Sequence, residues 1–337
     1  MSFTESKKKE IILYLLEKIG RNESSVVQQT SQSFHVTPAS IYKYLDKLIS
    51  DGIVDKQKRG SYSLVKQTRY CSVNLNTPQF HSEERIYAEF IEPELSTLPS
   101  NVVRIWDYLC SEMLNNVIDH SMGDKLEITI EQDYLKTTVQ LADNGIGIFE
   151  KIRAFFGLAS AEEAVGELFK GKLTTDAQHH SGEGIFFSSR LADDFLIISS
   201  GLVFSHSRFS SDSLLKDASK AGTIVRMSLS NRSKKEAKDI FDQYAGVDRG
   251  FTRTQIPLTH YFDTAPVSRS HAKRLCSRLD RFQEVELDFS GLDWIGQGFA
   301  HQLFVVFQNE HPGIKLIPTG MSQDVENMYR HVMNKPI

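Results

Sequence analysis

The chain has 337 residues, of which 40% are hydrophobic and 24% are charged, and its formal net charge is -4. This composition is typical of a globular protein, and the length favours two or three domains over a single core. No apolar run approaches the roughly 20 residues of a membrane-spanning helix, and no continuous apolar signal segment follows the first residues. The three cysteines lie far apart without a CxxC pair, which argues against a disulfide framework or a zinc site. We therefore expect a cytoplasmic protein that does not enter a membrane.

The start of the chain is basic, with 11 Lys and Arg against 7 Asp and Glu in the first 66 residues, whereas the remainder has 28 against 36. Here "KKKEIILYLLEKIGR" and "SSVVQQTSQSF" predict two helices. A third helix is expected to begin at Thr37-Pro38 and to end at Gly52. The stretch "GIVDKQKRGSYSLV" then predicts two short strands joined by a turn at Arg59-Gly60. This order resembles the winged helix-turn-helix of transcription regulators, and we assign that fold to residues 1–68.

The resemblance to winged helices implies DNA binding through the third helix and the hairpin. The residues expected at DNA are Ser40, Tyr42, Lys43 and Lys47 of the helix and Lys56, Lys58 and Arg59 of the hairpin. The local basic excess favours phosphate contacts. The alternative is a three-helix module that serves dimerisation or protein docking.

After residues 69–98, which we expect to form a linker with one helix, the stretch "CSEMLNNVIDHSMGDKLEITIE" predicts a helix followed by a strand. Apolar residues occupy most faces of this helix, so that Glu112 and Asn116, four residues apart, form a polar seam on one face. The later strand "LKTTVQLADNGIGIF" ends at Asp143, and the glycines after it allow a ligand to approach the backbone.

Two further motifs complete this middle region. Gly182 and Gly184, in "HHSGEGIFFSSRLAD", are expected to open a helix whose backbone N–H groups can receive a phosphate. The stretch "AGTIVRMSLS" predicts a strand that begins at Gly222-Thr223. The order and spacing of these motifs resemble the GHKL ATP-binding domain of gyrase, the mismatch-repair ATPases, the heat-shock chaperone of that class, histidine kinases and anti-sigma-factor serine kinases. We assign residues 99–232 to such a domain.

The GHKL resemblance implies a role for each motif, with ATP and Mg²⁺ as cofactors. Asp143 would accept the adenine amino group with support from Thr223, and Asn116 would bind Mg²⁺ through its side-chain oxygen. The glycines expected to contact the base or the phosphates are Gly145, Gly147, Gly182 and Gly184. Glu112 would act as the general base for an attacking water, or would only polarise a metal-bound water.

Residues 150–181 are expected to form a mobile lid, which includes Thr174 and Thr175, and Lys172 in it would reach a phosphate or remain a solvated charge. Adjacent His179-His180 make a poor metal chelate because neighbouring side chains of an extended segment point apart. Asp119 and His120 are interpreted as structural. A histidine kinase is excluded, because His81 precedes a single helix and leaves no room for a helical hairpin before Glu112.

The end of the chain, residues 250–337, predicts alternating strands and helices. With the motif "DFSGLDWIGQGFA" it resembles the STAS fold of anti-sigma-factor antagonists. Those proteins are phosphorylated on a serine at a position where this chain has Gly296-Gln297-Gly298-Phe299, and Ser290 lies too early, so phosphorylation is not expected. The helix after this motif could bind an anion or the ATP domain; the alternative is a docking or dimerisation module.

The predicted fold is therefore multidomain α/β: a winged helix (α+β), a GHKL α/β sandwich and a STAS-like β/α domain. We expect a bacterial type of ATP-binding regulator, a slow Mg²⁺-dependent ATPase and a homodimer, whose nucleotide state controls the binding of DNA or of a protein partner. The alternatives are an anti-sigma-type protein serine/threonine kinase and an ATP-operated signalling scaffold without DNA binding.

Overall fold

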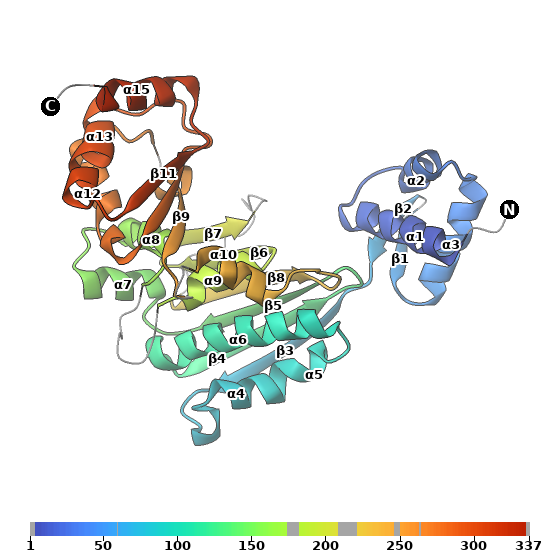
Figure 1. Ribbon diagram of the computed structural model, residues 1–337. Helices are drawn as coiled ribbons and strands as arrows, with labels where there is room; N and C mark the ends of the chain where they lie inside the picture. Colours follow the sequence, from blue (N-terminus) through green and yellow to red (C-terminus); the bar gives the residue numbers. More distant parts are fainter. Residues whose placement is uncertain are drawn as a thin grey trace.

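A computed structural model describes residues 4–58, 60–173, 182–207, 221–245, 250–262 and 264–334 of the chain. We call residues 4–66 the head, residues 67–245 the body and residues 250–334 the tail. The head stands apart at one side of the body, and the tail packs on the body at the opposite end (Figure 1).

The head contains helices followed by a hairpin, in the expected order. Its elements are α1 (Glu5–Gly20), α2 (Val26–Phe34), α3 (Pro38–Ser50), β1 (Val54–Lys58) and β2 (Ser61–Leu64), the two strands being antiparallel. Helix α3 begins as predicted, because Thr37 Oγ1 accepts the N–H of Ser40 at 3.3 Å and proline occupies the first turn. Leu15 of α1 and Leu45 of α3 are buried in an apolar core that belongs to the head.

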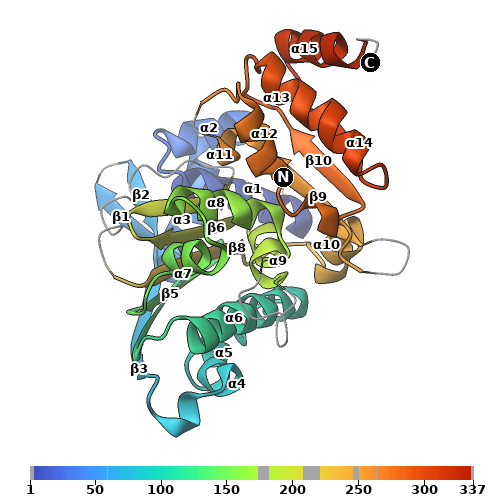
Figure 2. The same ribbon diagram turned by 90° about the vertical axis from the view of Figure 1, so that its left-hand side faces the viewer.

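The body is built on one antiparallel sheet, whose six strands in the described residues have the order β3-β4-β5-β8-β6-β7. The strands are β3 (Gln67–Asn74), β4 (Lys125–Gln132), β5 (Lys136–Asp143), β6 (Asp194–Ser199), β7 (Leu202–Ser207) and β8 (Thr223–Ser230). The longer helices are α6 (Ser100–His120), α7 (Ile148–Phe156), α8 (Ala161–Lys170), α9 (Gly184–Leu191) and α10 (Ala237–Tyr244). Helix α6 lies along the sheet with Trp106 and Leu109 fully buried, as its apolar faces require (Figures 1 and 2).

The expectation that residues 69–98 form a linker with one helix is wrong for the linker, which is a strand at its start, whereas helical turns do follow. Strand β3 pairs along its whole length with β4, from Gln67 opposite Gln132 to Asn74 opposite Lys125. The segment after it forms η1 (Pro78–Phe80), α4 (Glu83–Ile86), the π-helical turn η2 (Tyr87–Ile91) and α5 (Glu92–Leu95). Their buried apolar side chains join the core around α6. The body therefore begins at the first residue of β3.

The tail has a parallel sheet of the order β11-β10-β9 within the described residues. Its strands are β9 (Arg253–Pro257), β10 (Glu284–Asp288) and β11 (Lys315–Thr319). Its helical elements are α11 (Leu258–Tyr261), α12 (Arg269–Cys276), η4 (Leu279–Arg281), α13 (Gln297–His301), η5 (Gln302–Phe307), α14 (Gln308–Glu310) and α15 (Gln323–Met333). This alternation of strands and helices is the one that the sequence predicts for this region.

Within the described residues, no helix combines the length and the apolar character that crossing a bilayer requires.

Candidate functional site

A cavity of about 380 Å³ opens at one end of the body sheet, a size within the range of ~300–1,000 Å³ of small-molecule sites. It brings together side chains and glycines from α6, from the turn after β5, from the start of α9 and from the start of β8. The sequence-predicted residues that line it are Glu112, Asn116, Asp143, Gly147, Gly182, Gly184 and Thr223. Segments more than 100 residues apart in sequence therefore meet at one site.

Asp143 lines this cavity where β5 ends, and it is only 8% exposed. Its Oδ1 accepts backbone N–H groups from Gly145 at 2.8 Å and from Thr223 at 3.3 Å. Burial raises the pKa of the Asp143 carboxyl, and these two amides only partly oppose that effect. A ligand that donates a hydrogen bond here would stabilise a carboxylate that is otherwise poorly solvated.

Two of the glycines after Asp143 allow the backbone to pack closely, in different ways. Gly147 has φ +85°, and a Cβ there would lie 2.6 Å from Ser199 Oγ, so a side chain would be both strained and crowded. Gly145 does not line the cavity; a Cβ on it would overlap the carbonyl oxygen of Ser121. Its amide instead holds Asp143 in place.

Glu112 faces the glycine that opens α9. A Cβ on Gly184 would overlap Glu112 Oε2, so a glycine is required for the carboxylate to lie against this backbone. Asn116 lies one helical turn further along the same wall of the cavity. The polar seam of α6 therefore points into the cavity, between the buried Asp143 and the glycine backbone.

Some residues that line the cavity were not predicted from the sequence. Lys151, four residues after Gly147, lines the cavity, and its Nζ donates to the carbonyl oxygen of His120 at 3.0 Å. The side chain of His120 also lines the cavity, whereas Asp119 is exposed and is not among the lining residues. The spacing of Lys151 from the glycine turn, one turn into the next helix, is the signal that could have identified it.

Lys172 is not among the residues that line the cavity. Its Nζ donates to the carbonyl oxygen of Arg281 at 2.9 Å, so that it contacts the tail. The expected lid, residues 150–181, is in part helical, since it includes most of α7 and all of α8. Thr174, Thr175 and His179-His180 lie outside the described residues.

A second cavity of about 360 Å³ shares Glu112 and Gly184 with the first. Its other lining residues are Tyr108, Glu183, Phe187, Phe241, Asp242, Ala245 and Phe251. Burial raises the pKa of Glu183. It also raises the pKa of Tyr108, to which the negative charges of Glu112 and Glu183 add smaller contributions. Glu112 thus stands between two cavities.

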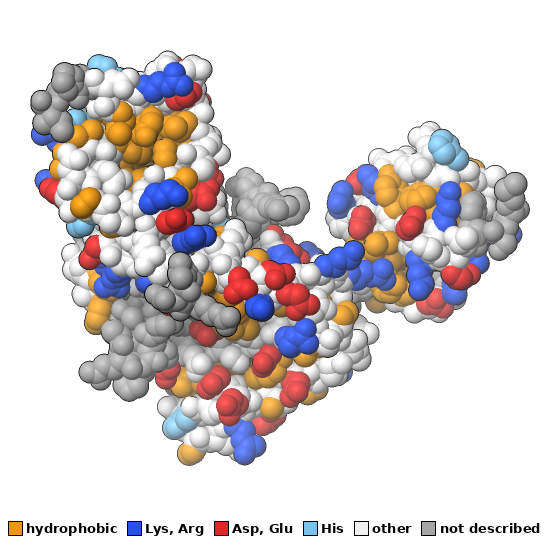
Figure 3. Space-filling model, viewed as in Figure 1, with side chains coloured by type: hydrophobic (Ala, Val, Ile, Leu, Met, Phe, Trp, Pro, Cys, Tyr) orange, Lys and Arg blue, Asp and Glu red, His pale blue; other side chains and the backbone are white. Residues whose placement is uncertain are grey.

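The expected DNA residues of the head lie mostly on its surface. Tyr42 is 46% exposed, Lys43, Lys47 and Lys56 are exposed, and Ser40 is half-buried because it belongs to the N-terminal cap of α3. The side chain of Lys58 and all of Arg59 are outside the described part of the chain. Figure 3 shows Lys and Arg side chains over the head and its junction with the body, and many Asp and Glu side chains on the body.

The start of α13 in the tail, where the sequence predicted a possible anion site, is partly covered by the chain itself. The N–H of Gly296 donates to the carbonyl oxygen of Pro266 at 2.9 Å, and that of Phe299 donates to Val267 at 3.3 Å. A Cβ on Gly296 would overlap Val267. Ser290 is exposed, just after β10.

Comparison with known families identifies two of the three parts. Residues 103–233 match the family of histidine kinase-, DNA gyrase B- and HSP90-like ATPases, so the chain contains a GHKL-type domain, which implies that it binds ATP. Residues 271–326 match a STAS-like domain of unknown function, which fits a regulatory role. A comparison of the chain with curated proteins gives no match.

Proposed function

We propose that this protein is a regulator in which Mg²⁺-ATP, bound and slowly hydrolysed in the body, controls the binding of DNA or of a protein partner. The observation that carries the proposal is the first cavity, which unites Glu112, Asn116, Asp143 and the glycines Gly182 and Gly184. The carboxylates of Glu112 and Asp143, which have different surroundings, face the same ligand-sized cavity. The glycine backbone that begins α9 lies at the edge of this cavity.

The polar groups of the cavity match the parts of ATP. Asp143 would accept the adenine amino group, and Thr223 would hold the turn beside the base, because its Oγ1 already accepts the N–H of Ile148 at 3.0 Å. The backbone of Gly182 and Gly184 would receive the phosphates. Asn116 would hold Mg²⁺ with phosphate oxygens as further ligands; no group of three or more His, Cys, Asp or Glu that could hold a metal occurs in the described residues.

When bound, Mg²⁺-ATP supplies an electrophilic terminal phosphate whose developing charge the metal neutralises. Glu112 would orient a water and take its proton, since its carboxylate lies against Gly184 at the phosphate side of the cavity. The second cavity, on the other side of Glu112, gives the attacking group space to enter.

The decisive experiment measures ATP binding and turnover with Mg²⁺ for the wild type, Glu112→Gln and Asp143→Asn. We expect Asp143→Asn to lose binding, because its amide nitrogen cannot replace both carboxylate oxygens as acceptors. Glu112→Gln should still bind, with turnover reduced by about 10²–10⁴-fold. A wild type that does not bind ATP would overturn the proposal, and an unchanged rate in Glu112→Gln would remove Glu112 as the base.

The regulatory output is proposed to pass through the head as a winged helix that binds DNA, with a homodimer presenting two heads to a two-fold site. Its support is the exposed Tyr42, Lys43 and Lys47 on α3. Lys43→Ala with Lys47→Ala should weaken gel-shift binding and flatten its salt dependence by about two units of slope. If the wild type shifts no DNA at low salt with ATP, the head docks a protein and the scaffold alternative is favoured.

A protein serine/threonine kinase of the anti-sigma type is the second candidate. The second cavity favours it, because a serine side chain of a partner could reach Glu112 through that space. Transfer of radiolabel from ATP to a serine-bearing partner would support this function, and free phosphate as the only labelled product would support hydrolysis.

A further inference from the structure

Helix α8 is shared between the nucleotide cavity and the tail. Leu168 lines the cavity, whereas Glu167 and Lys170 of the same helix contact tail residues. Both views of the molecule show α8 lying directly against the tail (Figures 1 and 2). Since packed interiors move as discrete units rather than deforming continuously, a shift of α8 would change the cavity and the tail contact together.

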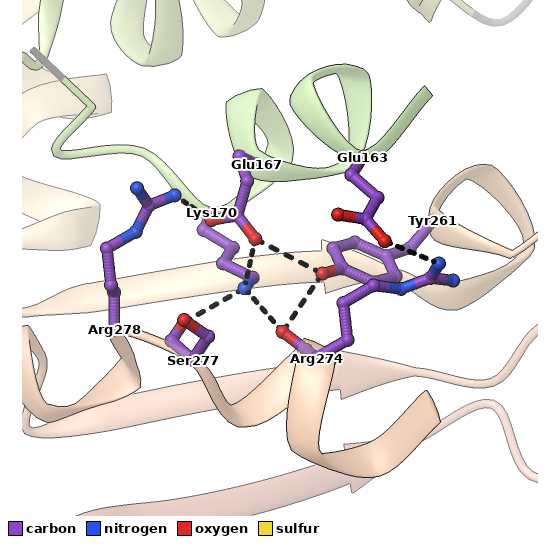
Figure 4. A network of polar contacts seen from close by, with 7 residues as sticks. All are labelled: Glu163, Glu167, Lys170, Tyr261, Arg274, Ser277 and Arg278. Carbon is purple, nitrogen blue, oxygen red and sulfur yellow. Dashed lines mark hydrogen bonds and ion pairs between the residues drawn. The ribbon is translucent and has the colours of Figure 1, made fainter. Parts of the chain in front are cut away.

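A buried charge cluster joins α8 to the tail (Figure 4). The ammonium of Lys170, which is 2% exposed, donates to Glu167 Oε1 at 2.7 Å and to the carbonyl oxygens of Arg274 at 3.1 Å and Ser277 at 2.9 Å. All three of its N–H groups therefore have acceptors. The guanidinium of Arg278 binds the other carboxylate oxygen of Glu167. Arg274, Ser277 and Arg278 of the tail therefore hold α8 in one orientation.

The residues that directly follow α8 contact Gly182, one of the proposed phosphate-binding glycines. Gly171 and Lys172 both have positive φ, of 77° and 51°, so the backbone turns sharply here. Leu173 then lines the cavity, and its N–H donates to the carbonyl oxygen of Gly182 at 3.0 Å. Lys172 and Arg281 bind each other reciprocally, each side chain donating to the other's carbonyl oxygen at 2.9 Å.

We infer that the tail positions the phosphate-binding side of the nucleotide cavity through Arg278 and Arg281, so that ATP binding and tail docking favour each other. This inference rests on the proposed ATP site. Neither arginine lines the cavity, and both act through α8 and residues 171–173. If ATP prefers the arrangement that the docked tail imposes, linkage requires that ATP also tightens the docking.

Opposite charges fix the orientation of the two surfaces. The tail contributes Arg274, Arg278 and Arg281, while α8 contributes Glu163 and Glu167. Complementary charges of this kind determine how two surfaces dock more than how tightly they dock. A partner that competes for these arginines would release the tail and thereby weaken ATP binding.

The test compares the full-length wild type with Arg281→Ala and Arg278→Gln, and uses Arg330→Ala as a matched control. Arg330 belongs to the tail but pairs with Glu326 within α15. We expect ATP affinity to fall by about 5-fold or more in the first two variants, a usual size for allosteric coupling, and to stay unchanged in the control. Arg281→Lys, which can still donate to Lys172, should restore part of the affinity.

A second measurement reports the reverse direction of the coupling. Hydrogen exchange of the α12 amides should slow when ATP is added to the wild type and to Arg330→Ala, and should slow less in Arg281→Ala. Arg278→Gln and Arg281→Ala leave Lys170 with all its acceptors, so both are expected to fold, which circular dichroism checks. If ATP affinity stays within twofold of the wild type and ATP leaves α12 exchange unchanged, the inference is wrong although the ATP site stands. Loss of ATP binding in the wild type would instead overturn the proposed function.

Discussion

The head and the tail are attached to the body in opposite ways. The head has its own apolar core, and among the described residues of the body Leu135, in the turn between β4 and β5, packs against it. The tail shares one continuous core with the body, in which Phe186 of α9 and Phe251 before β9 have ring centroids 4.4 Å apart. Buried charge, from Lys170 and Glu167, also reinforces the tail contact.

This difference determines which conformational changes can pass between the parts of the molecule through packed side chains alone. A change at the proposed nucleotide cavity would reach the tail through α8, whereas its route to the head is longer, through β3 and the turn between β4 and β5. Control of the head would therefore need a second event, such as pairing of two chains or recruitment of a partner. The contrast can be tested by substitutions in the buried charge cluster at the tail and in the separate apolar core of the head.

The largest effect is expected from breaking the buried charge cluster. Glu167→Ala leaves the Lys170 ammonium buried without its carboxylate, which should cost about 3–5 kcal/mol of unfolding free energy. Trp106 of the body and Trp294 of the tail are the two tryptophans of the chain, so fluorescence in urea reports on both parts. Glu326→Ala, which removes an exposed pair, should cost about 1 kcal/mol or less. Equal effects of the two substitutions would contradict a special role for the cluster.

A truncation in the core of the head should have a slightly smaller and strictly local effect. Leu45→Ala is expected to cost about 2–5 kcal/mol, because a fully packed leucine leaves a cavity. Hydrogen exchange in α1 and α3 should accelerate, while the tryptophan transition of body and tail stays at the same urea concentration. Leu109→Ala in α6 provides the opposite control. A fluorescence transition that moves with Leu45→Ala would show that the head and body unfold as one unit.

The charge of Lys170 gives the tail contact a pH dependence. Burial lowers the pKa of Lys170 from 10.5 to about 8. Between these values the unfolded chain binds more protons, so the wild type should gain stability as the pH rises. Relative to Lys170→Met, the gain should be on the order of 2 kcal/mol by pH 10. Urea unfolding of both proteins at several pH values measures it, and a constant difference from pH 8 to 10 would contradict it.

The smallest effect concerns the stability that the unliganded protein loses because the Asp143 carboxylate is buried in the proposed ATP site. Because burial raises the pKa of Asp143, its carboxylate destabilises the unliganded fold at neutral pH, and this cost disappears as the pH falls below the folded value. Asp143→Asn keeps an oxygen acceptor for Gly145 and Thr223 and should stabilise the unliganded protein by about 0.5–1 kcal/mol. Adding ATP should raise the melting temperature of the wild type alone. A lower melting temperature for unliganded Asp143→Asn would refute this account.

The residues that line the cavity could be predicted from the sequence where they belong to local motifs. Glu112 and Asn116 follow from helix periodicity, and Asp143 with Gly147 follows from a strand that ends in glycines. Residues were missed where a distant segment creates the environment. Strand β3 was assigned to a linker because its partner β4 begins about fifty residues later, and Glu167 with Lys170 looks like an ordinary solvated pair until the tail, a hundred residues further on, buries it.

The short passage from β2 to β3 has a mechanical consequence. Only Val65 and Lys66 separate the last strand of the head from the edge strand of the body sheet, a span of about 7 Å at full extension. Val65 is also tied back to the head, since its N–H donates to the carbonyl oxygen of Ile53 at 2.9 Å. The connection is therefore too short for the head to move far from the edge of the body sheet. The head can change its orientation at Lys66, but a larger displacement requires the body to move with it.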